Sequence, residues 1–305
     1  MSIGVQRGSF AAVPTPLNEQ GEIDGNALSR IIENILAGGC SGVLVLGSSG
    51  EVTALPLEAR RKVIETAVSA VNGKASVLAG IASPSLYGAR AELEVMHEYP
   101  LDAVVVTPPY YGPVDQDTVS RFYRSLAEYS RVPIIGYHIP AFTGVRIEVD
   151  TARALALDGV LAGVKDSNRD QEYFQQIARI RHDTDRPWSA FVGTDSLLLP
   201  ALMAGATGGI TLSASITPAW TAGLVAAFDS ADFPEAIRLQ EKLTAVILAI
   251  RRGAFPAGAK AALQHLGLSG RTLAAPAIGL SEQEAHALGV VLDGLGVSRE
   301  AGGPR

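Results

Sequence analysis

The chain has 305 residues, of which 47% are hydrophobic and 18% are charged, and its formal net charge is −6. This composition is typical of a globular protein and excludes a disordered chain. No basic or arginine-rich tract indicates nucleic-acid binding, and no apolar run is long enough to predict a membrane span.

Short apolar runs alternate with longer amphipathic segments over most of the chain. The apolar runs are uninterrupted, as expected for parallel strands that are buried on both faces. We predict eight strands, at residues 9–14, 42–46, 76–80, 102–107, 133–137, 160–165, 189–193 and 208–212. Amphipathic patterns predict helices between them, most clearly at 57–71 and 116–129.

Eight strands, each followed by a helix-length segment, predict an α/β fold of the (β/α)8 TIM-barrel type over residues 1–218. An open doubly wound sheet would carry a glycine-rich phosphate loop after its first strand, and none is present. After residue 218 the strand signal ends. A C-terminal helical domain is therefore predicted for residues 219–305, with helices at 219–251, broken at 230–234, and at 256–267 and 281–293. Residues 299–305 are expected to be frayed.

The cysteine content and the N-terminal residues help to predict the cellular compartment of the protein. The first seven residues lack the apolar segment of a signal peptide. The single cysteine, Cys40, excludes an internal disulfide and favours a reducing environment. We interpret Cys40 as a small buried hydrophobe rather than a reactive thiol. A cytoplasmic protein is expected.

Lys165 ends the sixth predicted strand. In a barrel of this type the reacting groups stand at the C-terminal ends of the strands and in the loops that follow them. Burial there disfavours the ammonium form of a lysine, and a neutral amine can attack a carbonyl to form a Schiff base. The commoner alternative is a lysine whose ammonium group reaches solvent.

Tyr137 ends the fifth predicted strand, next to the strand of Lys165. Its phenol is placed to carry a proton to and from a carbinolamine. His138 follows directly and is expected to point to the opposite face, because successive strand side chains alternate. We therefore assign His138 a packing or supporting role.

The loop Gly47-Ser48-Ser49-Gly50-Glu51 follows the second strand. Its glycines permit a tight turn, and successive N–H groups in such a turn hold anions such as a substrate carboxylate. An ordinary serine-containing loop is the alternative. The remaining candidates lie after the fourth and seventh strands and in the eighth, and they are Tyr110, Tyr111, Gly193, Asp195, Ile210 and Thr211.

The five histidines show no spacing typical of metal ligands, so no metal site is predicted. Taken together, the motifs resemble the dihydrodipicolinate synthase / N-acetylneuraminate lyase family of class I, Schiff-base aldolases. The resemblance spans nearly the whole chain and rests on the segments 12–17, 47–51, 108–111, 137–144, 163–166 and 256–263.

This resemblance implies a role for each candidate. Lys165 would condense with the ketone of pyruvate or another 2-oxo acid, and Tyr137 would relay protons. Ser48 would link Tyr137 to Tyr111, which in the family reaches across from a neighbouring subunit. The backbone N–H groups of Ser48 and Ser49 would hold the carboxylate. The resemblance also implies a homotetramer, built as a dimer of dimers, and no metal or organic cofactor beyond the covalent imine.

Two positions depart from the family pattern. Ser48 and Ser49 stand where at least one threonine is usual, but the hydroxyl group is kept. Phe142 stands where dihydrodipicolinate synthases carry an arginine that binds the carboxylate of aspartate semialdehyde. Phenylalanine forms no bidentate ion pair with a carboxylate. The substitution therefore argues against a role in lysine biosynthesis.

The leading hypothesis is a Schiff-base lyase that cleaves a 2-keto-3-deoxy sugar acid to pyruvate and an aldehyde. Alternatives on the same fold are a 4-hydroxy-tetrahydrodipicolinate synthase in the strict sense, an N-acetylneuraminate lyase and a 2-keto-3-deoxy acid dehydratase. The alternative from another class is a non-catalytic barrel that binds 2-oxo acids. The presence of both Lys165 and Tyr137 argues against such a pure binder, which needs neither.

Overall fold

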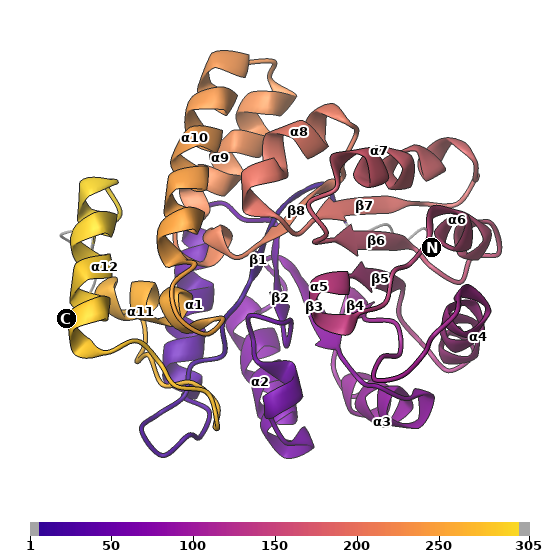
Figure 1. Cartoon of the computed structure of the whole chain (residues 1–305), viewed down its shortest axis with the longest axis horizontal. Coiled ribbons are helices and arrows are strands. Elements are labelled where there is room, and N and C mark those ends of the chain that lie inside the picture. The colour runs from indigo at the N-terminus through magenta and orange to yellow at the C-terminus, as the bar shows by residue number, and fades with distance from the viewer. Residues whose placement is uncertain (1–5, 299–305) are drawn as a thin grey trace.

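Eight short apolar runs pair in parallel, each with the next in chain order, and the eighth pairs with the first to close a barrel (Figure 1). The computed structural model describes residues 6–298. The strands are β1 (Gly8–Ala12), β2 (Gly42–Val45), β3 (Ser76–Ile81), β4 (Ala103–Val106), β5 (Ile134–His138), β6 (Gly163–Asp166), β7 (Ser189–Val192) and β8 (Gly208–Thr211). Each overlaps a predicted strand, so the predicted barrel is confirmed.

The helices cover the outside of the barrel and extend beyond it. They are α1 (Gly25–Ala37), α2 (Leu57–Val71), α3 (Leu86–Met96), α4 (Gln116–Ala127), α5 (Pro140–Thr143), α6 (Val149–Leu157), α7 (Gln171–Arg179), α8 (Leu198–Met203), α9 (Pro218–Asp229), α10 (Phe233–Ile250), α11 (Ala257–His265) and α12 (Glu282–Gly294). Several begin at a residue whose side chain accepts a backbone N–H of the first turn, a stabilising N-cap, namely Asp24, Ser85, Asp115, Asp170, Asp232 and Ser281.

The C-terminal part of the chain is helical, as predicted, and its break falls within the predicted residues 230–234. Helix α9 ends at Asp229, and Asp232 caps α10 by accepting the N–H of Glu235. Helix α9 packs against β1 and α1, and α10 packs against α9. Figure 1 shows α10, α11 and α12 gathered on one side of the barrel. The domain division after residue 218 stays a prediction, and residues 299–305, expected to be frayed, lie outside the described residues.

The barrel interior is a separate apolar cluster, to which Phe10, Phe191 and Ile210 contribute. The rings of Phe10 and Phe191 meet edge to face with centroids 5.4 Å apart. At Gly42 a Cβ would lie 2.6 Å from the Phe10 ring, so a glycine there leaves space for this large side chain. The aromatic pair fills the barrel and leaves only its C-terminal mouth for a site.

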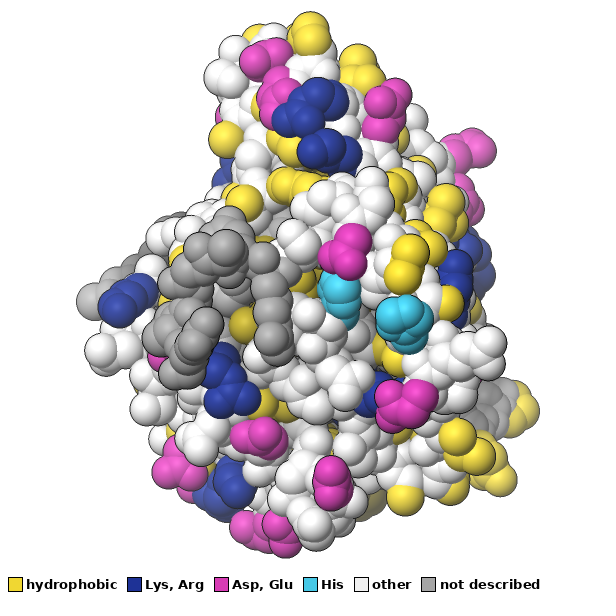
Figure 2. All heavy atoms as spheres, turned by 90° about the vertical axis from the view of Figure 1, so that its left-hand side faces the viewer, with side chains coloured by type: hydrophobic (Ala, Val, Ile, Leu, Met, Phe, Trp, Pro, Cys, Tyr) yellow, Lys and Arg dark blue, Asp and Glu magenta, His cyan; other side chains and the backbone are white. Residues whose placement is uncertain are grey.

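The outer face of the C-terminal helices carries acidic and basic side chains that are scattered rather than gathered in one patch (Figure 2). A groove between α11 and α12 is lined by His265, His286 and Asp293, among others. Nε2 of His265 lies 2.9 Å from Oδ1 of Asp293. Within residues 6–298, no helix combines the length and apolar character that crossing a membrane requires.

Candidate active site

Lys165 points into the barrel beside Tyr137. The two residues are direct partners in the pairing of β5 with β6, and Lys165 pairs on its other side with Phe191. The lysine is only 3% exposed, and its Nζ lies 4.2 Å from the centroid of the Tyr137 ring. An ammonium group over an aromatic face is attracted by the ring's quadrupole. The two residues predicted to carry the chemistry are therefore in contact.

Gly193, after β7, leaves the space that the lysine side chain occupies. A Cβ at this position would lie 3.0 Å from Cε of Lys165 and 2.1 Å from Oγ of Ser167. The backbone N–H of Gly193 donates to the carbonyl of Asp166 at 2.7 Å, which fixes the approach of the two strand ends. Gly193 thus lies directly against Lys165.

The loop Gly47–Glu51 lies on the other side of Tyr137. Oγ of Ser48 is 3.4 Å from Oη of Tyr137, while Oγ of Ser49 donates to the carbonyl of Ala12 at 3.0 Å. A small pocket joins the loop to the phenol, with Gly47, Ser48 and Tyr137 in its wall. In the described part of the chain, the N–H groups of Ser48 and Ser49 donate to no protein acceptor. Adjacent N–H groups of this kind suit an anion.

The two tyrosines after β4 have different surroundings. The hydroxyl of Tyr110 donates to the carbonyl of Ala82 at 3.1 Å, and burial raises the pKa of this phenol. Tyr111 is 96% exposed and has a φ of 71°, in the left-handed region that side chains other than glycine rarely adopt. Among the described residues, no hydrogen bond joins Tyr111 to Ser48 or Tyr137 of the same chain.

Asp195, the acidic candidate after β7, is buried. Its Oδ1 accepts the backbone N–H of Ser213 at 2.6 Å, and its carbonyl accepts Nε2 of Gln240 at 3.1 Å. Burial raises the pKa of the Asp195 carboxyl, and the hydrogen bonds from Ser213 oppose this shift. The residue therefore ties the end of β7 both to the end of β8 and to α10.

The two candidates in β8 lie on opposite faces of the strand. Ile210 belongs to the apolar interior of the barrel. A Cβ on Gly209 would approach both Thr211 and Leu198 of α8, so these side chains share the outer face. The side chain of Thr211 therefore lies outside the barrel, and only its backbone belongs to the strand end.

Sequence reasoning passed over Thr107, at the end of β4. Ala103 and Val105 face the barrel interior, and the alternation of strand side chains places Thr107 on the same face. Thr107 is 3% exposed, and its hydroxyl has no protein partner among the described residues. A buried hydroxyl that faces the barrel interior without a partner is free to bond a substrate. Alternation within the strand separates the two faces, but only the structure shows which of them is the interior.

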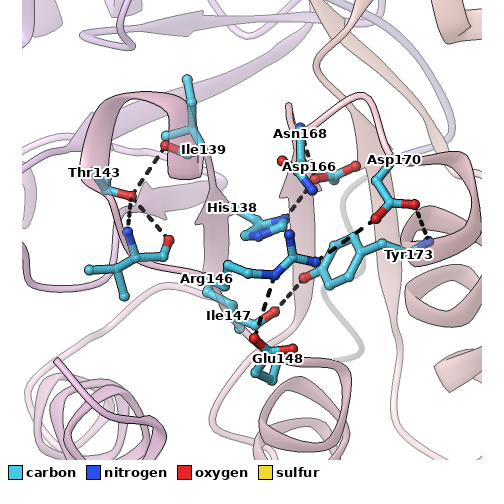
Figure 3. A network of polar contacts seen from close by, with 11 residues as sticks. His138, Ile139, Thr143, Arg146, Ile147, Glu148, Asp166, Asn168, Asp170 and Tyr173 are labelled. Carbon is cyan, nitrogen blue, oxygen red and sulfur yellow. Dashed lines mark hydrogen bonds and ion pairs between the residues drawn. The ribbon is translucent and has the colours of Figure 1, made fainter.

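A second polar cluster lies behind the site, on the outer face of β5 and β6 (Figure 3). Nδ1 of His138 is 2.7 Å from Oδ1 of Asp166, which also accepts the N–H of Asn168 at 3.1 Å. The ring of Tyr173 packs on His138 with centroids 4.3 Å apart. Burial raises the pKa of Tyr173 well above its usual range. His138 thus faces away from the barrel interior, as the strand alternation predicted.

Arg146 lies at the edge of this cluster (Figure 3), and its side chain is 41% exposed. Its guanidinium lies over the Tyr173 ring and pairs with Glu148 and Asp170. No three His, Cys, Asp or Glu side chains of residues 6–298 are grouped so as to hold a metal ion.

A parallel barrel with a buried lysine at the end of β6, over a tyrosine at the end of β5, has the arrangement of a Schiff-base lyase. The model of the Dihydrodipicolinate synthetase family matches residues 5–294, and the chain belongs to this family. Members of the family are lyases that act through a Schiff base, so this protein is a lyase with a class I aldolase mechanism.

Relatives of known name cover almost the whole chain. An uncharacterized DapA-like lyase of Halobacterium salinarum is 32% identical over 95% of this chain and 94% of its own. A 4-hydroxy-tetrahydrodipicolinate synthase of Syntrophus aciditrophicus is 31% identical over 95% of this chain and 99% of its own. The solved dihydrodipicolinate synthase of Aquifex aeolicus superposes with a TM-score of 0.89 at 29% identity, covering 96% and 99% of the two chains.

A further solved structure is described as complexed with pyruvate. The chloride-inhibited dihydrodipicolinate synthase of Acinetobacter baumannii superposes with a TM-score of 0.89 at 26% identity, covering 95% of this chain and 99% of that one. The family is thus established from both sequence and fold.

Proposed function

We propose that the protein cleaves a 2-keto-3-deoxy sugar acid to pyruvate and an aldehyde through an imine on Lys165. The observation that carries the proposal is the position of Lys165, with its Nζ 4.2 Å from the centroid of the Tyr137 ring. The Tyr137 hydroxyl in turn lies 3.4 Å from Oγ of Ser48. An amine next to a hydroxyl relay is the arrangement that imine formation requires.

The proposed chemistry proceeds in balanced steps. The amine of Lys165 adds to the C2 ketone, and Tyr137 protonates the hydroxyl that leaves as water. The bond between C3 and C4 then breaks, and its electron pair moves towards the iminium nitrogen to give an enamine. Tyr137 accepts the proton of the C4 hydroxyl as this carbon becomes the aldehyde. Protonation of the enamine at C3 and hydrolysis release pyruvate and regenerate the amine.

The carboxylate of the substrate is assigned to the backbone N–H groups of Ser48 and Ser49, which donate to no other protein group in the described chain. Gly47 permits the close approach of this backbone. Gly193 and Ile210 are assigned to the walls of the site. Among the polar candidates, Thr211 contributes through its backbone because its side chain faces α8. Asp195 and Tyr110 are assigned a structural role, since their side chains are bonded to protein groups at the ends of the strands.

Phe142 supports a sugar-derived aldehyde over one that carries a carboxylate. This residue lies in α5, is 58% exposed, and packs edge to face on Phe255 with ring centroids 5.6 Å apart. An aromatic pair at this place offers no charged partner to a carboxylate. The runner-up is a 4-hydroxy-tetrahydrodipicolinate synthase, which is the name carried by the Syntrophus relative.

The proposed assembly is a cytoplasmic homotetramer, a dimer of dimers, in which Tyr111 completes the site of a neighbouring subunit. Its 96% exposure within one chain supports this role, because a tyrosine of this kind usually gains a contact at an interface. No metal or organic cofactor takes part in the proposed reaction, since the lysine itself carries the covalent intermediate.

Borohydride reduction in the presence of pyruvate, followed by peptide mass mapping, tests the proposal directly. The expected result is a reduced pyruvyl adduct on Lys165, absent in Lys165→Ala. A folded wild-type protein that forms no adduct contradicts the proposal. Product analysis then separates the candidates: a lyase releases free pyruvate from the sugar acid, a dehydratase releases water and keeps the carbon chain, and the synthase condenses pyruvate with aspartate semialdehyde.

A further inference from the structure

Glu51, the last residue of the loop Gly47–Glu51, is buried and bonded to the C-terminal part of the chain. Its Oε1 accepts the backbone N–H of Ala274 at 2.8 Å, and its carboxylate forms an ion pair with Nζ of Lys260 in α11. Its backbone has a φ of 55°, in the left-handed region. Such a conformation persists only where the surroundings hold it.

Lys260 is almost completely buried, with 1% of its surface exposed. Its Nζ also donates to the carbonyl of Thr272 at 2.6 Å. Burial lowers the pKa of this lysine, and the charge of Glu51 acts in the opposite direction. The ammonium group is therefore tied both to the loop and to the segment between α11 and α12.

The loop Gly47–Glu51 is short and has a hydrogen bond within it, so a shift at Glu51 is expected to move Ser48 as well. The N–H of Glu51 donates to the carbonyl of Ser48 at 3.2 Å. The carbonyl of Gly50 accepts the hydroxyl of Thr15 at 2.8 Å, and Ser49 is bonded to Ala12. One edge of the loop is thus held by the segment around β1, and the other by the Glu51–Lys260 pair.

We propose that the Glu51–Lys260 pair is a positioning device, by which the C-terminal helical segment sets the conformation of the loop that binds the substrate carboxylate. The proposal rests on the carboxylate role assigned above to Ser48 and Ser49. A buried ion pair stabilises a fold little compared with apolar side chains of the same volume. The pair is therefore better explained by the loop conformation that its directional contacts fix than by a gain in the stability of the fold.

Such a device acts on substrate binding more than on turnover. Misplacing the N–H groups of the loop weakens the hold on the carboxylate equally in the bound substrate and in the transition state, which raises KM. Lys165 and Tyr137 belong to other strands and keep their mutual contact, so kcat is expected to fall less than KM rises, and its fall reports the shift of Ser48 away from the Tyr137 hydroxyl. We expect KM for the 2-oxo acid to rise about tenfold or more when the pair is removed.

The decisive variant is the double substitution Glu51→Leu/Lys260→Met. Lys260→Met alone leaves the Glu51 charge buried without its partner and is expected to lower the melting temperature. The double variant replaces both charges by apolar side chains and is expected to recover part of that melting temperature, while KM stays raised; the N–H of Ala274 and the carbonyl of Thr272 lose their partners, which limits the recovery. His265→Gln is the matched control, because it alters α11 at its contact with Asp293 and touches no loop residue.

The readouts are KM, kcat, melting temperature and the pyruvate concentration that gives half-maximal borohydride trapping on Lys165. A double variant that is folded and has the wild-type KM and half-trapping concentration overturns the positioning role. Failure of the wild-type protein to form any adduct instead contradicts the proposed function. An adduct in the wild type, combined with a raised half-trapping concentration in the double variant but not in His265→Gln, supports both.

Discussion

His138 and Asp166 form a buried pair directly behind the two residues proposed to carry the chemistry. They are partners in the pairing of β5 with β6, one residue beyond Tyr137 and Lys165, and their side chains meet at 2.7 Å on the outer face. The imidazole is fully buried and the carboxylate is 2% exposed. The same two strands therefore present a reactive pair inwards and a structural pair outwards.

Loss of the imidazole is expected to destabilise the fold. His138→Leu leaves the Asp166 carboxylate with the single N–H of Asn168, and a hydrogen bond to a charged group is worth about 1.5–3 kcal/mol. Denaturant unfolding measures this loss. Asp166→Asn added to His138→Leu is expected to recover part of it by removing the charge. Arg146→Ala, at the solvent edge of the same cluster, is the control and should change stability by less than about 1 kcal/mol.

Gly193→Ala is expected to impair the lysine while leaving the fold intact. The added Cβ would lie 3.0 Å from Cε of Lys165, so this side chain must give by a few tenths of an ångström, and 2.1 Å from Oγ of Ser167, which must move away. Because a misplacement of about 1 Å can lower turnover by about 100-fold, we expect a loss of up to this size. The measurement is kcat together with the rate of adduct formation. Gly294→Ala is the control because a Cβ there meets nothing within 4 Å, and equal effects of both variants would contradict the role of Gly193.

Removing the Tyr137 hydroxyl is expected to lower kcat by about 100- to 10,000-fold, because general acid–base catalysis is lost at imine formation and at the carbon-bond step. Tyr137→Phe keeps the ring under Nζ of Lys165, so the fold should hold. The control is Tyr110→Phe, which loses only the bond to the carbonyl of Ala82. The rate of adduct formation, measured by single-turnover borohydride trapping, distinguishes the two variants. If this rate falls equally in both, Tyr137 does not act in the proton relay.

Asp195→Asn is expected to raise stability at neutral pH. Because burial raises the pKa of Asp195, the folded state holds its proton more tightly than the unfolded chain. The protonated Asp195 carboxyl therefore contributes its full stabilisation of the folded state below the pKa of the unfolded chain, near 3.9. This contribution is lost as the pH rises through the pKa of the folded state. Asparagine mimics the protonated form at every pH and keeps an oxygen for the N–H of Ser213.

The free energy of unfolding of wild type and Asp195→Asn, measured from pH 3.5 to 8, checks this expectation. The advantage of the variant should grow with pH and vanish at the acid end. Asp115→Asn should behave oppositely, since hydrogen bonds from Thr118 lower the pKa of that carboxyl. A less stable Asp195→Asn protein at pH 7 would show that the carboxylate charge is needed for the fold.

The barrel could be predicted because each buried parallel strand appears in the sequence as an uninterrupted apolar run. A run such as 42–46 is apolar at every position, since one face meets the barrel interior and the other meets helices. The same property hides which residues face inwards. Thr211 was selected as a site residue and Thr107 was not, although the structure turns Thr107 inwards and Thr211 outwards. Orientation depends on the register that closes the barrel, where Phe10 pairs with Ile210.

Contacts between segments that are far apart in the chain could not be predicted from the sequence either. Glu51 and Lys260 each belong to a motif used in recognising the family, but nothing in either motif indicates that the two meet. Their pairing requires α11 to return to the loop after β2, which the folded barrel and the C-terminal helices determine together. Local patterns predict local structure, and long-range pairs follow only from the closed fold.

Tyr111 offers a test of the assembly that no single-chain measurement provides. If its hydroxyl completes a neighbour's site, Tyr111→Ala should lose nearly all activity while the subunit stays folded, because the side chain is 96% exposed within the chain. Lys165→Ala subunits should be inactive for the separate reason that they lack the amine. Mixing the two inactive proteins is then expected to restore activity, since a mixed pair contains one site with both residues native.

Random pairing makes half of the dimers mixed, and each carries one complete site of two, so about a quarter of wild-type activity is expected after full subunit exchange. Differently tagged subunits verify the exchange. Mixing Lys165→Ala with Tyr137→Phe is the control, because both residues belong to the site of the same subunit, so no mixed dimer contains a complete site. Exchange without recovery of activity in the Tyr111→Ala mixture would place Tyr111 outside the neighbouring site, and the proposed dimer contact would have to be abandoned.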